Sequence, residues 1–140
     1  MLVRLIYTSR VTNNIEATVI KDILRVSEQN NMIDNVSGVL LFSSSYFLQL
    51  LEGPRRAVNR AYARILVDKR HEDACMIRYE PIVSRQFGQW RMGYIGEGIF
   101  NKEVLFKYTT DGKFDPYSMS PDSALDLLLE LLQRSVQIKS

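Results

Sequence analysis

Stretches of alternating or continuous apolar residues, each of strand length, recur five times along the chain. They cover residues 2–8, 36–42, 46–52, 76–84 and 87–95. Three consecutive serines separate the second stretch from the third, which predicts a hairpin. Because successive side chains of a strand point to opposite faces, each stretch assigns its residues to one face or the other of a sheet.

Two segments with helical spacing of apolar residues lie between these strands. The first is capped by Asn13 or Asn14 and runs to about Glu28, with an apolar stripe made of Val19, Ile20, Ile23 and Leu24. The second opens at Gly53-Pro54, since proline fits the first helical turn. Its apolar positions are Ala57, Val58, Ala61, Tyr62, Ile65 and Leu66. The order β-α-β-β-α-β-β predicts an α+β fold, a ferredoxin-like sandwich with both helices on one face of a mainly antiparallel sheet.

A third helix is announced near the C-terminus by Ser120-Pro121-Asp122. It carries two leucine stripes, Leu125, Leu128, Leu129 and Leu132 on one side and Leu127 and Leu131 on the other. A helix with two apolar stripes must be covered on two sides. It packs on the open face of the sheet and either on a second subunit or on a short helix of its own chain; both alternatives remain open. We therefore divide the chain into a domain at 1–96 and a helical extension at 97–140.

Composition and charge exclude several classes of protein. Apolar residues make up 46% and charged residues 24%, as in ordinary globular proteins, and the net charge of +2 is too small to indicate nucleic-acid binding. The one cysteine, Cys75, permits neither an intrachain disulfide nor a tetrahedral metal set. No apolar run reaches the length of a signal peptide or a membrane span, so we expect a cytoplasmic protein.

Conventional catalytic signatures are missing from the sequence. There is no Walker loop, no dinucleotide-binding glycine motif and no zinc-protease motif. The single histidine, His71, lies in a charged run and is expected to be a solvated residue at a helix end rather than a general base. Hydrolysis, phosphoryl transfer and metal chemistry therefore lack their parts.

A polar residue interrupts the apolar stretch 46–52. Alternation places Gln49 on one face with Phe47 and Leu51, so the amide is expected to be buried. A buried amide without partners costs about 1–3 kcal/mol, and Tyr7 on the inward face of the first strand or a bound heterocycle would supply those partners. The alternative is an edge-strand glutamine that faces water.

Two further pairs deserve a place among the candidates. Asn30 and Asn31 close the first helix, which is an ordinary role for asparagine. Trp90 and Met92 lie two apart on the last strand and should project to the same face. Core packing is their default role, but at that spacing they could compete for one pocket beside the central strand.

Taken in order, several short segments of residues 2–96 resemble the BLUF family of blue-light photoreceptors. They are Leu5-Ile6-Tyr7-Thr8-Ser9, Asn30-Asn31, Ser37-Gly38-Val39-Leu40, Phe47-Leu48-Gln49-Leu50-Leu51-Glu52-Gly53, Tyr62-Ala63-Arg64-Ile65, Asp68-Lys69-Arg70-His71 and Trp90-Arg91-Met92. The tail, Phe106-Lys107-Tyr108 and Ser118-Met119-Ser120-Pro121, resembles the C-terminal helical cap of short, stand-alone PixD-type members. Arg91 departs from the family, which usually has a small residue there; alternation points it away from the pocket.

The resemblance implies an FAD that lies between the two helices. Tyr7 is then the photo-oxidisable electron donor, and Gln49 the amide that hydrogen-bonds both the tyrosine and the flavin. Asn31, with Asn30 alongside, would hold the carbonyl edge of the ring. The ring would be sandwiched, and its ribityl and phosphate tail bound, by Ile23, Ile65, Arg64, Asp68, Arg70 and His71. A solvated helix end is the alternative for the four charged or polar residues of that set.

The resemblance also implies how a signal arises and leaves. Light would rearrange Gln49, and the strand that carries Trp90 and Met92 would pass the change outward. No output domain follows in this sequence, so we expect protein–protein contacts with a downstream signalling protein and a homo-oligomer. Neither a membrane nor a nucleic acid is an expected partner.

Three other functions are alternatives to this one. An RNA-binding sheet would need exposed aromatic residues and a basic face, and the aromatic-glycine signature is absent. A flavin reductase or an acyl-phosphate hydrolase would be a small α+β enzyme, but no residues are dedicated to a nicotinamide. A protein that binds flavin only as a structural ligand would have no need of both Tyr7 and Gln49.

Overall fold

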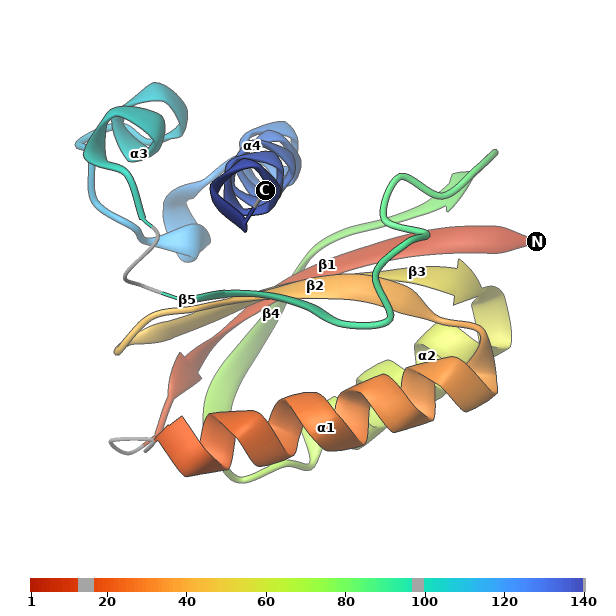
Figure 1. The fold of residues 1–140 in the computed structure, drawn as a ribbon. Coiled ribbons are helices and arrows are strands. Elements are labelled where there is room, and N and C mark those ends of the chain that lie inside the picture. Colours follow the sequence, from red (N-terminus) through yellow and green to blue (C-terminus); the bar gives the residue numbers. More distant parts are fainter. Residues whose placement is uncertain (13–16, 97–99, 140) are drawn as a thin grey trace.

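The computed structural model describes residues 1–12, 17–96 and 100–139, with side chains described at 1–12, 19–96 and 100–134. Its centre is a single sheet of five strands (Figure 1). The strands are β1 (Leu2–Val11), β2 (Ser37–Phe42), β3 (Tyr46–Pro54), β4 (His71–Ile82) and β5 (Gly93–Gly96). Their spatial order is β4-β1-β3-β2-β5, with antiparallel neighbours except for the parallel pair β2 and β5.

Helices cover both faces of this sheet (Figure 1). They are α1 (Ala17–Asp34), α2 (Arg55–Leu66), α3 (Lys102–Tyr108) and α4 (Pro121–Lys139), with a 3₁₀ turn, η2 (Pro116–Ser118), before the last. The first two lie on one face, and α3 and α4 lie on the other. The predicted α+β order with two helices on one face of a mainly antiparallel sheet is confirmed.

The two faces of the sheet bury separate clusters of side chains. On the α1 and α2 side, Leu5, Tyr7 and Leu51 pack with the apolar face of α2. On the other side, Ile6 and Leu50 pack with α3 and α4. Neighbouring residues of one strand therefore enter different cores, as strand geometry requires.

Both leucine stripes of α4 pack against this chain, with Leu125 and Leu129 of the first stripe partly buried. Leu127, Leu128 and Leu131 are fully buried and Leu132 nearly so, in one cluster with Val104 and Leu105 of α3. The alternative in which the second stripe faces the chain's own short helix is therefore confirmed, and no second subunit is needed to cover it. The proposed division after residue 96 stays a prediction, and its neighbours 97–99 lie outside the described residues.

The first helix differs from its prediction at both ends. The proposed caps Asn13 and Asn14 lie outside the described residues. At the other end α1 runs to Asp34 rather than Glu28, because its stop signal is Asn35, which takes the left-handed conformation at φ 59°. The Val36 N–H then donates to the Asn31 carbonyl at 2.9 Å, which closes the last turn.

Two other elements also differ from the sequence pattern. The fifth strand, expected at 87–95, is only Gly93–Gly96, because the amides before it bond elsewhere: Trp90 N–H donates to the Phe87 carbonyl at 3.0 Å. The fourth strand begins at His71, earlier than expected. On α2 burial fades towards the end of the helix, so that Leu66, placed in the apolar stripe, is exposed.

Gly38 supplies a test of the sheet at its most crowded point. A Cβ on this residue would overlap the Leu50 carbonyl oxygen of the neighbouring strand. Gly38→Ala is therefore expected to lower the free energy of unfolding by about 1–3 kcal/mol, measured by urea denaturation. Gly88→Ala is the control, since a Cβ there meets only the Arg85 side chain at 3.4 Å. Equal destabilisation by both substitutions would contradict the prediction.

Candidate functional site

A cavity of about 200 Å³ lies between α1, α2 and the central strands of the sheet. All ten residues predicted to bind a cofactor line it, and so does Met92. They are Tyr7, Ile23, Asn30, Asn31, Gln49, Arg64, Ile65, Asp68, Arg70 and His71. Residues far apart in the sequence thus meet in one place, which the local pattern alone does not show.

A buried pair forms the floor of the cavity. Tyr7 of β1 and Gln49 of β3 lie directly opposite each other on adjacent strands and are 3% and 5% exposed. The Tyr7 hydroxyl donates to Gln49 Oε1 at 2.5 Å, and Gln49 Nε2 donates to Met92 Sδ at 3.5 Å. The predicted burial of Gln49 is confirmed, and the edge-strand alternative is wrong because β3 lies in the middle of the sheet.

The surroundings of Tyr7 keep its hydroxyl protonated. Burial raises the pKa of Tyr7 well above its ordinary value, and the nearby Tyr62 and Asp68 raise it further. The Tyr62 ring lies 5.5 Å from the Tyr7 ring, centroid to centroid. At neutral pH Tyr7 is therefore a neutral phenol with one strong acceptor, Gln49 Oε1.

One wall of the cavity is held to the start of β5 by a side chain. Asn31 is 3% exposed within α1, and its Nδ2 donates to the Arg91 carbonyl at 2.6 Å. Asn31 is therefore an internal helix residue with a tertiary bond, not a helix-ending residue as its position suggested. The Arg91 side chain is exposed and does not line the cavity, as expected, although residue 91 is not part of a strand.

Trp90 and Met92 lie on different faces of the sheet, so the prediction that they share one is wrong. Met92 lines the cavity and packs with the clusters below α1 and α2. Trp90 packs with the cluster below α3 and α4, next to the point where Gly93 meets Leu132. The prediction failed because residues 87–92 are not a strand, and strand alternation therefore does not apply to them.

Charged side chains gather where the cavity opens to solvent. Asp68 and Arg70 form an ion pair with side chains 30% and 40% exposed, and Arg64 reaches Asp34 at 3.3 Å. The hydrogen bond from Arg70 lowers the pKa of the Asp68 carboxyl and raises that of the guanidinium. The open end of the cavity is therefore lined by charged groups, and its two guanidinium groups can bind an anionic group.

His71 is built into the wall rather than solvated at a helix end. Its Nε2 lies 2.6 Å from the Ile65 carbonyl oxygen, which can only accept, so Nε2 carries a proton. Its Nδ1 lies 2.7 Å from Ser9 Oγ, and the ring meets that of Phe47 edge-on. The residue begins β4 and joins the end of α2 to β1, which the charged run in the sequence concealed.

Six lining residues were absent from the prediction. They are Val26, Ser27, Leu40, Phe47, Leu51 and Ala61. Strand alternation could have found Phe47 and Leu51, which share the face of Gln49. Helical spacing could have found Val26 and Ser27, which lie three and four residues after Ile23.

The lining suits a flat heterocycle with a polar tail. Ile23 of α1 and Ile65 of α2 supply apolar walls from two helices, while Gln49 and Asn31 supply amide groups at the buried end. Among the described residues no three His, Cys, Asp or Glu side chains are grouped as metal ligands. Nor is any helix of that part long and apolar enough to cross a bilayer.

Comparisons with known proteins agree with this geometry. Residues 2–93 match the family described as BLUF, sensors of blue-light using FAD. The blue light- and temperature-regulated antirepressor BluF of Escherichia coli (strain K12) is 35% identical over 122 residues, which are 87% of this chain and 30% of that protein. The chain thus spans about a third of this curated relative.

Two solved structures cover nearly the whole chain. The ground state of BlsA is 29% identical with a TM-score of 0.84, over 94% of this chain and 88% of that one. The dark state of BlrB, a BLUF protein, is 28% identical with a TM-score of 0.76, over 96% of each chain. The similarity therefore extends past residue 93 into the C-terminal helices.

The protonated Tyr7 leads to a prediction for alkaline solution. Because its pKa is raised on folding, the folded protein retains a proton that the unfolded chain releases above about pH 10. The free energy of unfolding therefore falls as the pH rises through this range, by at most about 1.4 kcal/mol per pH unit for one proton. Tyr7→Phe should make that fall shallower in urea denaturation between about pH 9 and pH 11. Parallel slopes for the two proteins would contradict this.

Proposed function

The chain belongs to the BLUF family of blue-light sensors, and on that premise we propose that Tyr7 and Gln49 form its light-driven switch. One observation carries the proposal: the Tyr7 hydroxyl donates to Gln49 Oε1 at the buried floor of a cavity whose lining suits a flavin. A phenol and an amide that face each other in a dry site can exchange a proton, or exchange the roles of hydrogen-bond donor and acceptor, while the covalent structure of the protein stays intact.

We propose that the flavin is FAD. Gln49, Asn31 and Asn30 would hold the polar edge of the ring, with Ile23 and Ile65 against its faces. Arg64 and Arg70 would bind the phosphate groups of the tail, since guanidinium groups bind phosphate through paired hydrogen bonds, and Asp68 would accept from the ribityl hydroxyls. His71 also lines the cavity, but its nitrogens already face Ser9 and Ile65, so its part is to shape the wall.

The bound flavin would supply absorption of blue light and, once excited, a strong oxidant. Tyr7 is the proposed electron donor, because it is the phenol at the buried end of the cavity. A phenol that loses an electron becomes strongly acidic, and Gln49 Oε1 at 2.5 Å is placed to accept its proton. Reversal of both transfers restores the neutral pair.

Gln49 converts this event into a change of hydrogen bonds. In the structure its oxygen accepts from Tyr7 and its nitrogen donates to Met92 Sδ. A half turn of the amide would place Nε2 next to the Tyr7 hydroxyl and Oε1 next to the Met92 sulfur. Oε1 and the sulfur are both acceptors, so no hydrogen bond can form between them. Met92 would lose its hydrogen bond from Gln49. Because β5 starts one residue later, at Gly93, the position of that strand would be affected.

The signal is proposed to leave through protein–protein contacts. The relative in Escherichia coli is described as an antirepressor, which acts on another protein, and we propose a downstream signalling protein as partner here too. A homo-oligomer and a cytoplasmic location stay predictions. We find no group of catalytic side chains among the residues that the structure describes, so turnover of a substrate is not part of the proposal.

One of the earlier alternatives conflicts with the fold. An RNA-binding sheet needs an open face, whereas α1 and α2 cover one face of this sheet and α3 and α4 cover the other (Figure 1). The reductase and the structural-ligand alternatives differ from a photoreceptor in what light does, so spectroscopy separates them.

The first experiment is an absorption spectrum before and after blue light. Purified protein is expected to show a flavin spectrum that moves reversibly to longer wavelength, as stronger hydrogen bonding to the ring lowers the transition energy. Gln49→Leu should keep the pigment and lose the shift, while Gln133→Leu, on the exposed side of α4, should leave it intact. A Gln49→Leu protein that binds flavin and still shifts would refute the switch; steady NADH consumption would favour the reductase.

A second experiment identifies the electron donor. Tyr7→Phe removes the hydroxyl that bonds Gln49 but keeps the ring, so flavin binding should persist and the red shift should be lost. Tyr62→Phe is a matched control, since its ring lies 5.5 Å from that of Tyr7 but does not line the cavity. Loss of the shift in the control and its survival in Tyr7→Phe would assign the donor to Tyr62 instead.

A further inference from the structure

The segment between β4 and β5 carries Met92 to the cavity without being part of the sheet. It runs over residues 83–92, and polar contacts hold its two ends. At the cavity end, Arg91 is bonded by Asn31 and Met92 by Gln49, and the Trp90 carbonyl accepts from Gly38 N–H at 2.9 Å. The other end is held by a group on the opposite face of the sheet.

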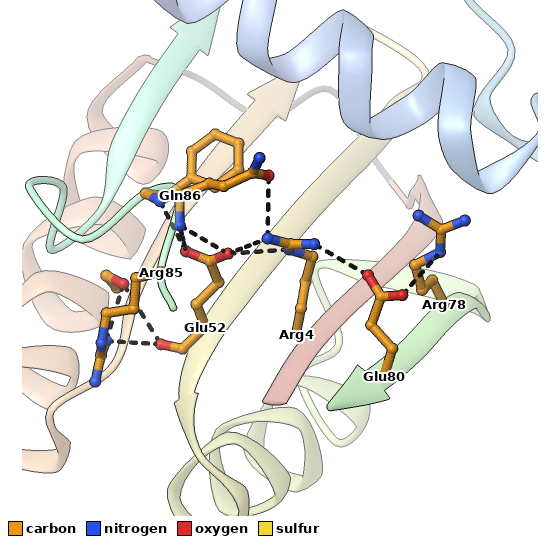
Figure 2. A network of polar contacts seen from close by, with 8 residues as sticks. Arg4, Glu52, Arg78, Glu80, Arg85 and Gln86 are labelled. Carbon is orange, nitrogen blue, oxygen red and sulfur yellow. Dashed lines mark hydrogen bonds and ion pairs between the residues drawn. The ribbon is translucent and has the colours of Figure 1, made fainter. Parts of the chain in front are cut away.

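That group is the carboxylate of Glu52, whose contacts Figure 2 shows. Its side chain is fully buried. Its Oε1 accepts from the backbone N–H of Phe87 at 2.7 Å and of Gln86 at 3.0 Å. Its Oε2 accepts from Arg4 Nε at 2.9 Å. Both oxygens are therefore occupied, which is the condition under which a buried charge is tolerated.

The same two strands carry the switch pair and the charge pair. Tyr7 lies opposite Gln49 and Arg4 lies opposite Glu52 in the β1 and β3 register. The pairs are three positions apart, an odd number, so their side chains project to opposite faces of the sheet. Glu52 thus belongs to the same strand as Gln49, while its carboxylate holds the segment that contains Met92.

Phe87 makes this attachment firm. Its N–H is bonded to Glu52, and its side chain is fully buried below α4, so the backbone there has little freedom. Arg85 adds a second attachment, since its guanidinium donates to the Glu52 carbonyl and to Ser37 Oγ, both at 3.0 Å. Only four residues lie between Phe87 and Met92, so the position of the anchor limits the position of the Met92 sulfur.

We propose that Glu52 is a positioning residue for the light switch: by fixing Gln86 and Phe87 it keeps Met92 within reach of Gln49. The proposal rests on the switch described above and names a residue outside the flavin cavity that controls it. When the carboxylate releases the segment, Met92 no longer accepts from Gln49 Nε2 in the dark orientation. The dark form then loses an interaction that the lit form lacks. Because this bond forms again as the amide turns back, its loss also raises the barrier of that step, and recovery in the dark slows.

The network continues beyond Arg4, which supplies a matched control. Arg4 also reaches Glu80 at 3.0 Å, Glu80 lies 3.8 Å from Arg78, and Arg78 reaches Asp122 in the first turn of α4 at 2.7 Å (Figure 2 for the first three residues). Glu80 is another carboxylate partner of Arg4 but touches neither Gln86 nor Phe87. Glu80→Gln therefore tests loss of a charge from the network without loss of the anchor.

Two substitutions of Glu52 separate its charge from its reach. Glu52→Gln keeps the shape but removes the charge opposite Arg4. Glu52→Asp keeps the charge but shortens the side chain by one methylene. It allows the same measurement if the first variant fails to fold. Either is expected to slow dark recovery about fivefold, as for loss of one neutral hydrogen bond, the Gln49 to Met92 bond, and Glu80→Gln should recover at the wild-type rate.

Two readouts show whether Glu52 acts through Met92. The ¹³C methyl resonance of Met92, assigned with Met92→Leu, should move in the Glu52 variants in the dark and stay in place in Glu80→Gln. In the Met92→Leu background the Glu52 substitutions should have no further effect on the recovery rate. An unchanged methyl resonance with wild-type recovery, or equal slowing in the Met92→Leu background, would overturn the proposal.

The same measurements separate this proposal from the proposed function. A wild-type protein that shows a reversible red shift while its folded Glu52 variants behave like wild type would refute the positioning role alone. A wild-type protein with no red shift would refute the switch, and the positioning role in it, whatever the methyl resonance shows.

Discussion

The hydrogen bond from Tyr7 to Gln49 is the interaction on which the site depends. It joins β1 to β3, two adjacent internal strands of the sheet, so the two residues stay opposite each other. Burial then makes both groups selective: the phenol keeps its proton, and the amide must use each end for a partner. A neutral pair held this closely in a dry cavity is stable in one arrangement and able to adopt another.

Much of the fold could be predicted because its signals are local. Strand alternation, helical spacing and the Gly53-Pro54 break lie within a few residues of the elements they define. The errors fall where a left-handed backbone conformation or a distant partner decides the structure. The end of α1 depends on a left-handed Asn35, and residues 87–92 leave the strand pattern because Glu52, more than thirty residues earlier, takes the amide of Phe87.

The candidate site divides in the same way. Gln49 could be found from the sequence, since a polar residue between apolar neighbours on both faces needs a buried partner. Most of the other predicted lining residues were named through the resemblance to a family, and the bonds that hold two of them span long distances in the chain. Asn31 bonds Arg91 and His71 bonds Ser9, each about sixty residues away. Local periodicity contains no information about such contacts, so Trp90 was assigned the wrong face and His71 the wrong environment.

The chemistry of the two polar pairs on β1 and β3 explains why one can switch while the other holds. Turning the Gln49 amide exchanges a donor for an acceptor and leaves the net charge of the cavity unchanged, so the two orientations differ by a few hydrogen bonds. Turning the Glu52 carboxylate away from Arg4 would leave a fully buried charge without its cation, which costs several kcal/mol in a protein interior, on the order of 3–5. A light-driven rearrangement needs one group with two accessible arrangements and a fixed frame against which the change is transmitted. The neutral pair meets the first condition and the ion pair the second, and a single strand, β3, carries one member of each.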